Sequence, residues 1–242
     1  MSNPTAAMLV IGDEILSGRT QDSNSHYLAG KLTGAGIDLR EVRVVADDAA
    51  AIGAAVRALS AAFTHVFTSG GIGPTHDDIT ADAIAAAFGV PIGLREDARA
   101  LLAARYRAMG VEFNEARQRM ARIPEGATLI DNPVSVAPGF SLGNVHVMAG
   151  VPEVFRAMLD GLLPRLSSGA APVSETLHLA RPEGEIAGPL AELASAFPAL
   201  SIGSYPYFEA GRYGTNIVVR GAEAAAVRAA IDRLRDALGG TP

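Results

Sequence analysis

The sequence contains no cysteine and no tryptophan, and aromatic residues make up only 5% of its 242 positions. Without cysteine the chain can form no disulfide, no thiolate metal site and no cysteine nucleophile. An excess of basic residues is missing too, because the formal net charge is −6. A broad nucleic-acid surface requires such an excess, so we expect no nucleic-acid partner.

Long apolar runs are also absent from the sequence. No stretch approaches the roughly 20 residues that a membrane-spanning helix needs, and the N-terminus does not resemble a signal peptide. We therefore expect a cytoplasmic protein with no membrane partner. What the chain does have is an apolar content of 49%, which is typical of a folded globular protein with a sizeable core.

Short apolar runs alternate with helical patterns along the N-terminal part of the chain. The expected strands are 6–11, 41–46, 65–68, 127–130 and 144–148, and the expected helices are 24–32, 47–62, 79–88, 95–108, 114–122 and 153–163. This alternation predicts an α/β fold with a mostly parallel sheet and helices on both faces.

Residues 167–172 are small or polar and include glycine and proline, so they are the best candidate for a linker. After them we expect strand 176–180, helix 183–196, strands 200–204 and 212–220, and helix 222–238. This β-α-β-β-α order predicts a small α+β sandwich. The sequence is therefore divided into an α/β domain at 1–168 and a small α+β domain at 169–242.

The loop after the third expected strand is the most informative segment, and it reads Ser69-Gly70-Gly71-Ile72-Gly73-Pro74-Thr75. Its glycines permit a close approach of the backbone to a ligand, and the following helix adds free N–H groups and a positive dipole end. Hydroxyls at both ends supply further donors. The candidate phosphate contacts are Ser69, Gly70, Gly71, Gly73 and Thr75. The loop is neither a Walker A sequence nor a dinucleotide-binding G-x-G-x-x-G.

Asp77 and Asp78 follow this loop directly. Carboxylates beside a bound anion are unfavourable unless they hold a cation or cap a helix. A divalent ion such as Mg²⁺ would bridge a carboxylate and a phosphate oxygen, so both aspartates are candidate metal ligands and catalytic residues. The alternative is that one of them caps the helix expected at 79.

Two further loops carry candidate residues. Asp13 and Glu14 follow the first strand, with Ser23 and Asn24 shortly after. Ligands in open parallel sheets bind outside the carboxyl ends of the strands, so this segment and the glycine-rich loop are expected on one crevice. Asp13 and Glu14 are then candidate catalytic groups and Asn24 a candidate ligand contact; the alternative is a polar turn followed by a helix capped by Ser23.

The remaining loop, 132–140, has the rigidity of a binding loop, with a plain connection as its alternative interpretation. Its candidate ligand contacts are Asn132, Pro138 and Gly139.

Taken in order, these motifs resemble the N-terminal domain of the competence/damage-inducible CinA-like family, within the MoaB/MogA-like molybdopterin-binding superfamily. The resemblance covers essentially the whole chain and is most specific at Gly70-Gly71-Ile72-Gly73-Pro74-Thr75-x-Asp77-Asp78-x-Thr80. Weaker matching pieces are Gly12-Asp13-Glu14-Ile15-Leu16-x-Gly18, Asn24 with Leu28-Ala29, Ala137-Pro138-Gly139-Phe140, Gly150-Val151-Pro152-Glu153 and Ser204-Tyr205-Pro206.

The resemblance implies a three-layer α/β/α sandwich, MogA-like, with a site for molybdopterin or an adenine nucleotide, and a homo-oligomer. For the CinA branch it implies a pyrophosphatase that uses Mg²⁺ or another divalent metal, with K⁺, to cleave ADP-ribose to AMP and ribose 5-phosphate. Related domains beside flavin-nucleotide enzymes hydrolyse FAD. In the molybdenum branch the loop supports adenylylation of molybdopterin, and the aspartate at the position of Asp78 lies near the metal.

The chain departs from the family in two places. CinA proteins carry a further C-terminal domain that deamidates nicotinamide mononucleotide, and we expect no such activity from a chain that ends at Pro242. Ser135 and Val136 replace the usual Gly-Thr pair of the loop 132–140, which removes a glycine and a hydroxyl. The function expected is hydrolysis of a nucleotide pyrophosphate such as ADP-ribose. The alternatives are non-hydrolytic molybdopterin binding linked to molybdenum-cofactor biosynthesis, and an oligomeric protein with a decayed site.

Overall fold

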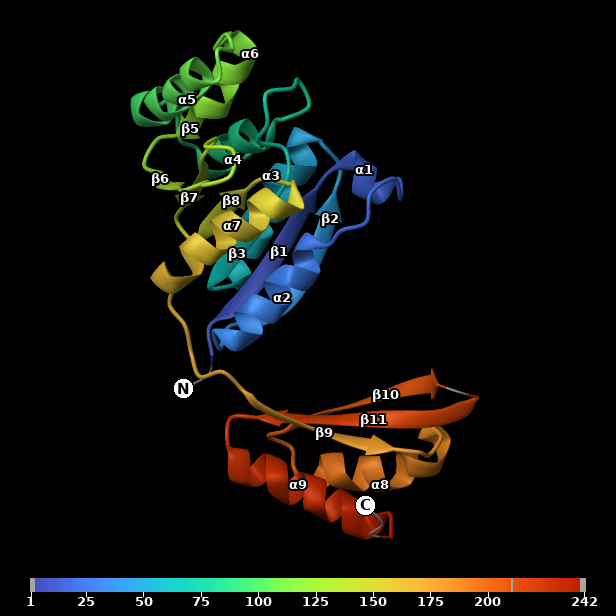
Figure 1. Ribbon diagram of the computed structural model, residues 1–242. Helices are drawn as coiled ribbons and strands as arrows, with labels where there is room; N and C mark the ends of the chain where they lie inside the picture. The colour runs from blue at the N-terminus through green and yellow to red at the C-terminus, as the bar shows by residue number, and fades with distance from the viewer. Residues whose placement is uncertain (1–2, 210, 240–242) are drawn as a thin grey trace. The chain divides into compact units, whose positions relative to one another are not determined.

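The structure is a computed structural model that describes residues 3–209 and 211–239 (Figure 1). The chain divides into two compact units, Met1–Gly169 and Ala170–Pro242, each with its own hydrophobic core. None of the helices in the described ranges is long and apolar enough to cross a membrane.

A six-stranded sheet in the order β2-β1-β3-β8-β7-β6 forms the centre of the N-terminal unit. The strands are β1 (Thr5–Ile11), β2 (Asp38–Val45), β3 (His65–Ser69), β6 (Thr128–Ile130), β7 (Gly139–Leu142) and β8 (Val145–Met148). Strands β2, β1, β3 and β8 run parallel to one another. Strand β7 pairs antiparallel with β8, and β6 pairs antiparallel with β7. The parallel strands therefore present their carboxyl ends at one edge.

Helices cover both faces of this sheet (Figure 1). On one face Met8 and Phe67 pack with residues of α2 (Asn24–Gly34) and α7 (Pro152–Leu162). On the other face Leu9 and Val66 pack with residues of α3 (Ala49–Ala62) and α4 (Thr80–Phe88). Alternate residues of β1 thus enter opposite cores, because successive side chains of a strand point to opposite faces. The predicted three-layer α/β/α sandwich is confirmed.

A small lobe departs from the prediction. It contains α5 (Glu96–Ala108), α6 (Glu115–Gln118), the 3₁₀ helix η1 (Arg119–Ala121) and an antiparallel pair, β4 (Ile92–Leu94) with β5 (Arg122–Pro124). The helix predicted at 114–122 is confirmed over 115–121, but as α6 followed directly by η1, and Arg122 already belongs to β5. A second short helix, α1 (Asp13–Leu16), stands where a polar turn was the alternative.

The C-terminal unit follows the predicted β-α-β-β-α order. Its elements are β9 (Val173–Leu179), α8 (Glu183–Ala196), β10 (Ser201–Glu209), β11 (Arg212–Gly221) and α9 (Ala224–Ala237). The strands form an antiparallel sheet in the order β10-β11-β9. Ile217 and Val219 of β11 pack with Ile186 of α8 and Ile231 of α9, which gives the unit its own core.

Candidate functional site

The carboxyl ends of the parallel strands open into one crevice of about 670 Å³. Glu14 follows β1, Asp47 follows β2, the glycine-rich loop follows β3, and Gly150 follows β8. The loop 132–140, called the third loop below, contributes Asn132. The loops after the first and third strands thus line the same crevice, as the strand order led us to expect.

The backbone of the glycine-rich loop adopts conformations that exclude side chains. Gly70 and Gly71 have φ angles of 110° and 69°. A Cβ atom on Gly70 would lie 2.2 Å from the carbonyl oxygen of Ile11, and one on Gly71 would lie 2.1 Å from the Thr80 hydroxyl oxygen. The loop therefore lies closer to its neighbours than any residue with a side chain would allow.

Some backbone groups of this loop have hydrogen-bond partners, but its central amides donate to no group within the described ranges. Gly70 N–H donates to the carbonyl of Met148 at 3.2 Å, and the Gly71 carbonyl accepts from Thr80 N–H at 3.0 Å. Within the described ranges, the N–H groups of Gly71, Ile72 and Gly73 donate no hydrogen bond. Three successive amides at the crevice are thus available to an anion.

Asp78 folds back onto its own loop. Its Oδ2 accepts from the Thr75 backbone N–H at 2.8 Å and from the Thr75 hydroxyl at 2.5 Å. Helix α4 has Ile79 at its N-cap and no capping bond from a side chain, so the alternative in which Asp77 or Asp78 caps this helix is wrong. Both aspartates line the crevice, whereas Thr75 does not.

Carboxylates gather at one side of the crevice. Asp47 Oδ2 accepts from the Asp13 backbone N–H at 3.0 Å. Burial, together with the negative charges of Asp13, Glu14 and Asp77, raises the pKa of Asp47 above its usual range. Across residues 3–209 and 211–239, no group of three or more histidine, aspartate or glutamate side chains is arranged to hold a metal ion. A bound cation would therefore need ligand oxygens as well.

Asn24 lies in a recess beside the crevice together with Ser69. Its side chain is buried, and its Nδ2 donates to Ser69 Oγ and to the Gly150 carbonyl, both at 2.8 Å. Asn24 thus joins the end of β3 to the end of β8. Ser23 occupies the N-cap position of α2, as the alternative interpretation had it, but its side chain makes no capping bond; Asp22 Oδ1 accepts from the first helical amides instead.

The third loop is held together by Asn132. Its Oδ1 accepts from Val134 and Ser135 N–H, and its Nδ2 donates to Ser135 Oγ at 2.6 Å and to the Ala137 carbonyl at 2.8 Å. The polar atoms of Asn132 are therefore all engaged inside the loop. Val136 has a φ of 71°, an uncommon conformation for a β-branched residue.

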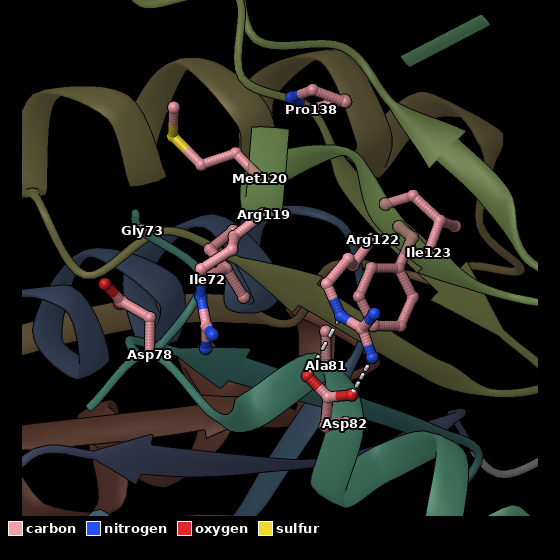
Figure 2. A pocket seen from close by; sticks show the side chains of 12 residues that line it. Ile72, Gly73, Asp78, Ala81, Asp82, Arg119, Met120, Arg122, Ile123 and Pro138 are labelled. Atoms are coloured by element: carbon pink, nitrogen blue, oxygen red, sulfur yellow. Dashed lines mark hydrogen bonds and ion pairs between the residues drawn. The ribbon is translucent and has the colours of Figure 1, made fainter. Parts of the chain in front are cut away.

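Gly139 lies in β7 rather than in the loop where it was expected. A Cβ atom there would lie 2.2 Å from the carbonyl oxygen of Val147, so this glycine serves the packing of the sheet. Pro138 lines a small recess that opens between the glycine-rich loop and η1 (Figure 2).

Three residues of the site escaped the sequence analysis: Asp47, Arg119 and Met120. Asp47 could have been found, because it follows a parallel strand exactly as Asp13 does. The basic residues of 95–122 have the pattern of a solvated helix face from which an arginine could reach the crevice, but the sequence does not single out Arg119. Met120 carries no signal, since it reaches the glycine-rich loop only through the folding of the small lobe. Asp13 is the one predicted catalytic residue that does not line the crevice, although its backbone contacts Asp47.

Comparison with known proteins places both parts of the chain beside characterised sequence families. Residues 172–241 match the FAD synthase middle domain. A probable FAD synthase of Caenorhabditis elegans is 32% identical over 98% of this chain and 50% of its own length. A CinA-like protein of Anaeromyxobacter sp. is 39% identical over 71% of this chain and 44% of its own. The chain spans about half the length of these two relatives.

The crystal structure of the protein CinA with unknown function from Thermoplasma acidophilum is similar with a TM-score of 0.62 and 34% identity, over 68% of this chain and 99% of that one. The resemblance to CinA-like and MoaB/MogA-like proteins is thereby confirmed. Since residues 7–168 match the probable molybdopterin binding domain, the chain belongs to that family.

Proposed function

We propose that this protein binds a nucleotide pyrophosphate in the crevice and hydrolyses it with the help of a divalent cation. One observation carries the proposal: the free amides of Gly71, Ile72 and Gly73 lie in the same crevice as the carboxylates of Glu14, Asp47, Asp77 and Asp78. Donors for phosphate oxygens and acidic groups for a cation are the two needs of pyrophosphate cleavage.

The crevice suits a ligand that carries phosphate beside a ring system. Its volume of about 670 Å³ falls within the usual range for cofactor sites. The amides of the glycine-rich loop would hold phosphate oxygens, and apolar side chains such as Val151 and Val154 line the same crevice. ADP-ribose and FAD both have this composition, and the names of the FAD-synthase-like relatives favour testing FAD.

The residues present fit a hard divalent cation. None of the ion pairs within the described ranges includes Glu14, Asp47 or Asp78, and carboxylate oxygens are the donors that Mg²⁺ prefers. Asp77 and Asp78 would hold the ion together with phosphate oxygens. When bound, it supplies positive charge that stabilises the phosphate that leaves.

The reaction needs only water and the pyrophosphate. The water oxygen attacks one phosphorus, the bond from that phosphorus to the bridging oxygen breaks, and the other phosphate leaves with that oxygen. Glu14 and Asp47 orient the water and accept its proton, and the raised pKa of Asp47 favours its part in that transfer. ADP-ribose would yield AMP and ribose 5-phosphate, and FAD would yield AMP and FMN.

Incubation of the purified protein with ADP-ribose or FAD, Mg²⁺ or Co²⁺, and K⁺, followed by chromatography, tests the proposal. We expect AMP release that Asp78→Ala lowers by about a hundredfold or more, the usual scale for loss of a group that acts on the transition state. Asp236→Ala on α9 removes the same charge outside the crevice and serves as the control. AMP release no greater than that of Asp78→Ala would contradict the proposal for that substrate.

A second candidate function is molybdopterin binding without hydrolysis. It is favoured by the family that residues 7–168 match. Calorimetric binding of molybdopterin, with no turnover of ADP-ribose or FAD, would support this candidate over the first.

A further inference from the structure

A small recess between the glycine-rich loop and η1 contains an arginine to which the proposed function gives no role. Arg119 lies in η1, and its side chain extends toward the loop that carries Ile72 and Gly73, beside Asp78 (Figure 2). The recess adjoins the crevice, because Gly71, Ile72, Gly73, Asp78 and Met120 line both.

Four other arginines of the small lobe have partners; Arg105 and Arg107 make no ion pair or side-chain hydrogen bond within the described ranges, but they do not line the recess. The engaged ones are Arg95 with Asp97, Arg99 with Glu96, Arg117 with the Glu112 carbonyl and the Tyr106 ring, and Arg122 with Asp82. Arg119 makes no ion pair and no side-chain hydrogen bond with any residue in the described ranges. It is therefore a cation without a structural partner, and it faces the loop whose amides are free.

The neighbouring carboxylate does not explain this arginine. Asp78 directs Oδ2 to the Thr75 backbone and hydroxyl, and the ion pair of the recess is the one between Arg122 and Asp82. A guanidinium presents several N–H donors in a plane that matches two phosphate oxygens. Arg119 and the amides of Gly71 and Gly73 together form a set of donors on two sides of one small space.

We propose that Arg119 binds the phosphate that the amides of Gly71, Ile72 and Gly73 hold, and that the small lobe thereby supplies the positive charge of the site. This inference rests on the proposed function and names a binding residue within the same site. It also assigns the small lobe a direct contact with the ligand.

Isothermal titration calorimetry with ADP-ribose, FAD and inorganic pyrophosphate tests this role. We expect Arg119→Ala to weaken binding about ten- to hundredfold, the scale of a lost charge-assisted hydrogen bond. Arg119→Lys keeps the positive charge but loses the planar pair of N–H donors. Its affinity should therefore lie between those of the wild type and Arg119→Ala. Arg107→Ala changes the charge of the same lobe outside the recess and should bind like the wild type. Binding by the wild type should also weaken more steeply with added salt than binding by Arg119→Ala.

The outcomes separate this inference from the proposed function. If Arg119→Ala binds as tightly as the wild type, the role of Arg119 is refuted while the proposed function stands. If the wild type binds but releases no AMP, and Arg119→Ala loses binding, hydrolysis is refuted while Arg119 stands. A wild type that binds none of the probes refutes both. Thermal melting checks that each variant is folded, and the exposed position of Arg119 in η1 favours folding.

Discussion

Gly70 and Gly71 hold a loop conformation that depends on the absence of side chains. At Gly70 the obstacle is the backbone carbonyl of Ile11, which no side-chain rotation can remove. We expect Gly70→Ala to lower the free energy of unfolding by about 1–3 kcal/mol or more, because strain adds to the collision. Urea denaturation measures this change.

Gly30→Ala is the matched control for that substitution. Gly30 lies inside α2, where an added Cβ atom would meet open space. Alanine there should raise the free energy of unfolding by up to about 1 kcal/mol, because alanine favours the helix. Equal effects of the two substitutions would mean that the loop is not constrained as described.

His146 is buried in the sheet, only 4% exposed, with Nδ1 2.9 Å from Ser141 Oγ and Nε2 3.4 Å from His65 Nδ1. Burial, and then the charge of His65, lowers the pKa of His146 to about 4 from the model-compound value of 6.5. The unfolded chain therefore takes up a proton at a pH where the folded chain does not. Stability present above pH 6.5 is lost as the pH falls toward about 4, by up to roughly 3 kcal/mol.

Urea denaturation between pH 4 and pH 8 measures this loss. His146→Gln should reduce the change in the free energy of unfolding between pH 6.5 and about pH 4, whatever its effect on stability at neutral pH. His76→Gln, at a side chain that is 99% exposed, should leave the slope unchanged. A wild type and a His146→Gln variant with parallel curves would contradict the assignment.

The chemistry of the site was largely readable from residue types, but the partners of single side chains were not. The run Gly70–Gly73 predicts free amides because glycine loops before helices commonly expose them. That Asn24 joins Ser69 to Gly150 depends on contacts between segments far apart in the chain. Such contacts leave no local pattern.

At the scale of elements, capping distinguishes two helices that looked alike in sequence. Asp48 Oδ1 accepts from Ala51 N–H at 2.8 Å at the start of α3, whereas Ser23 makes no such bond before α2. We expect Asp48→Ala to cost about 1 kcal/mol in thermal or urea unfolding, and Ser23→Ala to cost much less. A larger loss for Ser23→Ala would contradict the assigned caps.

Helices with clear apolar spacing and strands in continuous apolar runs were predictable, whereas three short antiparallel strands were not. Helix α8 has the predicted bounds, and β1, β3 and β8 differ from prediction by a residue at most at either end. Strands β4, β5 and β7 have only three or four residues, and Gly93 and Gly139 weaken their strand character. Their strand state depends on the partner that pairs with them, which the local sequence does not reveal.

At the scale of the whole molecule, two cores are joined by a short exposed segment. Gly169 N–H donates to the Ala35 carbonyl, which holds the chain to the first unit as far as that residue. We expect limited digestion with elastase to cut first between Ala170 and Ala171, since Pro172 protects the next bond. Mass spectrometry of the fragments checks this, and an earlier cut inside either unit would contradict the division. The homo-oligomer stays a prediction that light scattering can test.

The position of β8 has a consequence for how the chain matures during synthesis. This strand lies in the middle of the sheet beside β3, yet it is made from residues 145–148. Until the ribosome has released that segment, β3 presents an unpaired edge, and the Gly150 carbonyl that Asn24 needs does not exist. A nascent chain shorter than about 150 residues therefore has its glycine-rich loop but no finished pocket around it, and nascent chains of increasing length should gain nucleotide affinity only beyond that point.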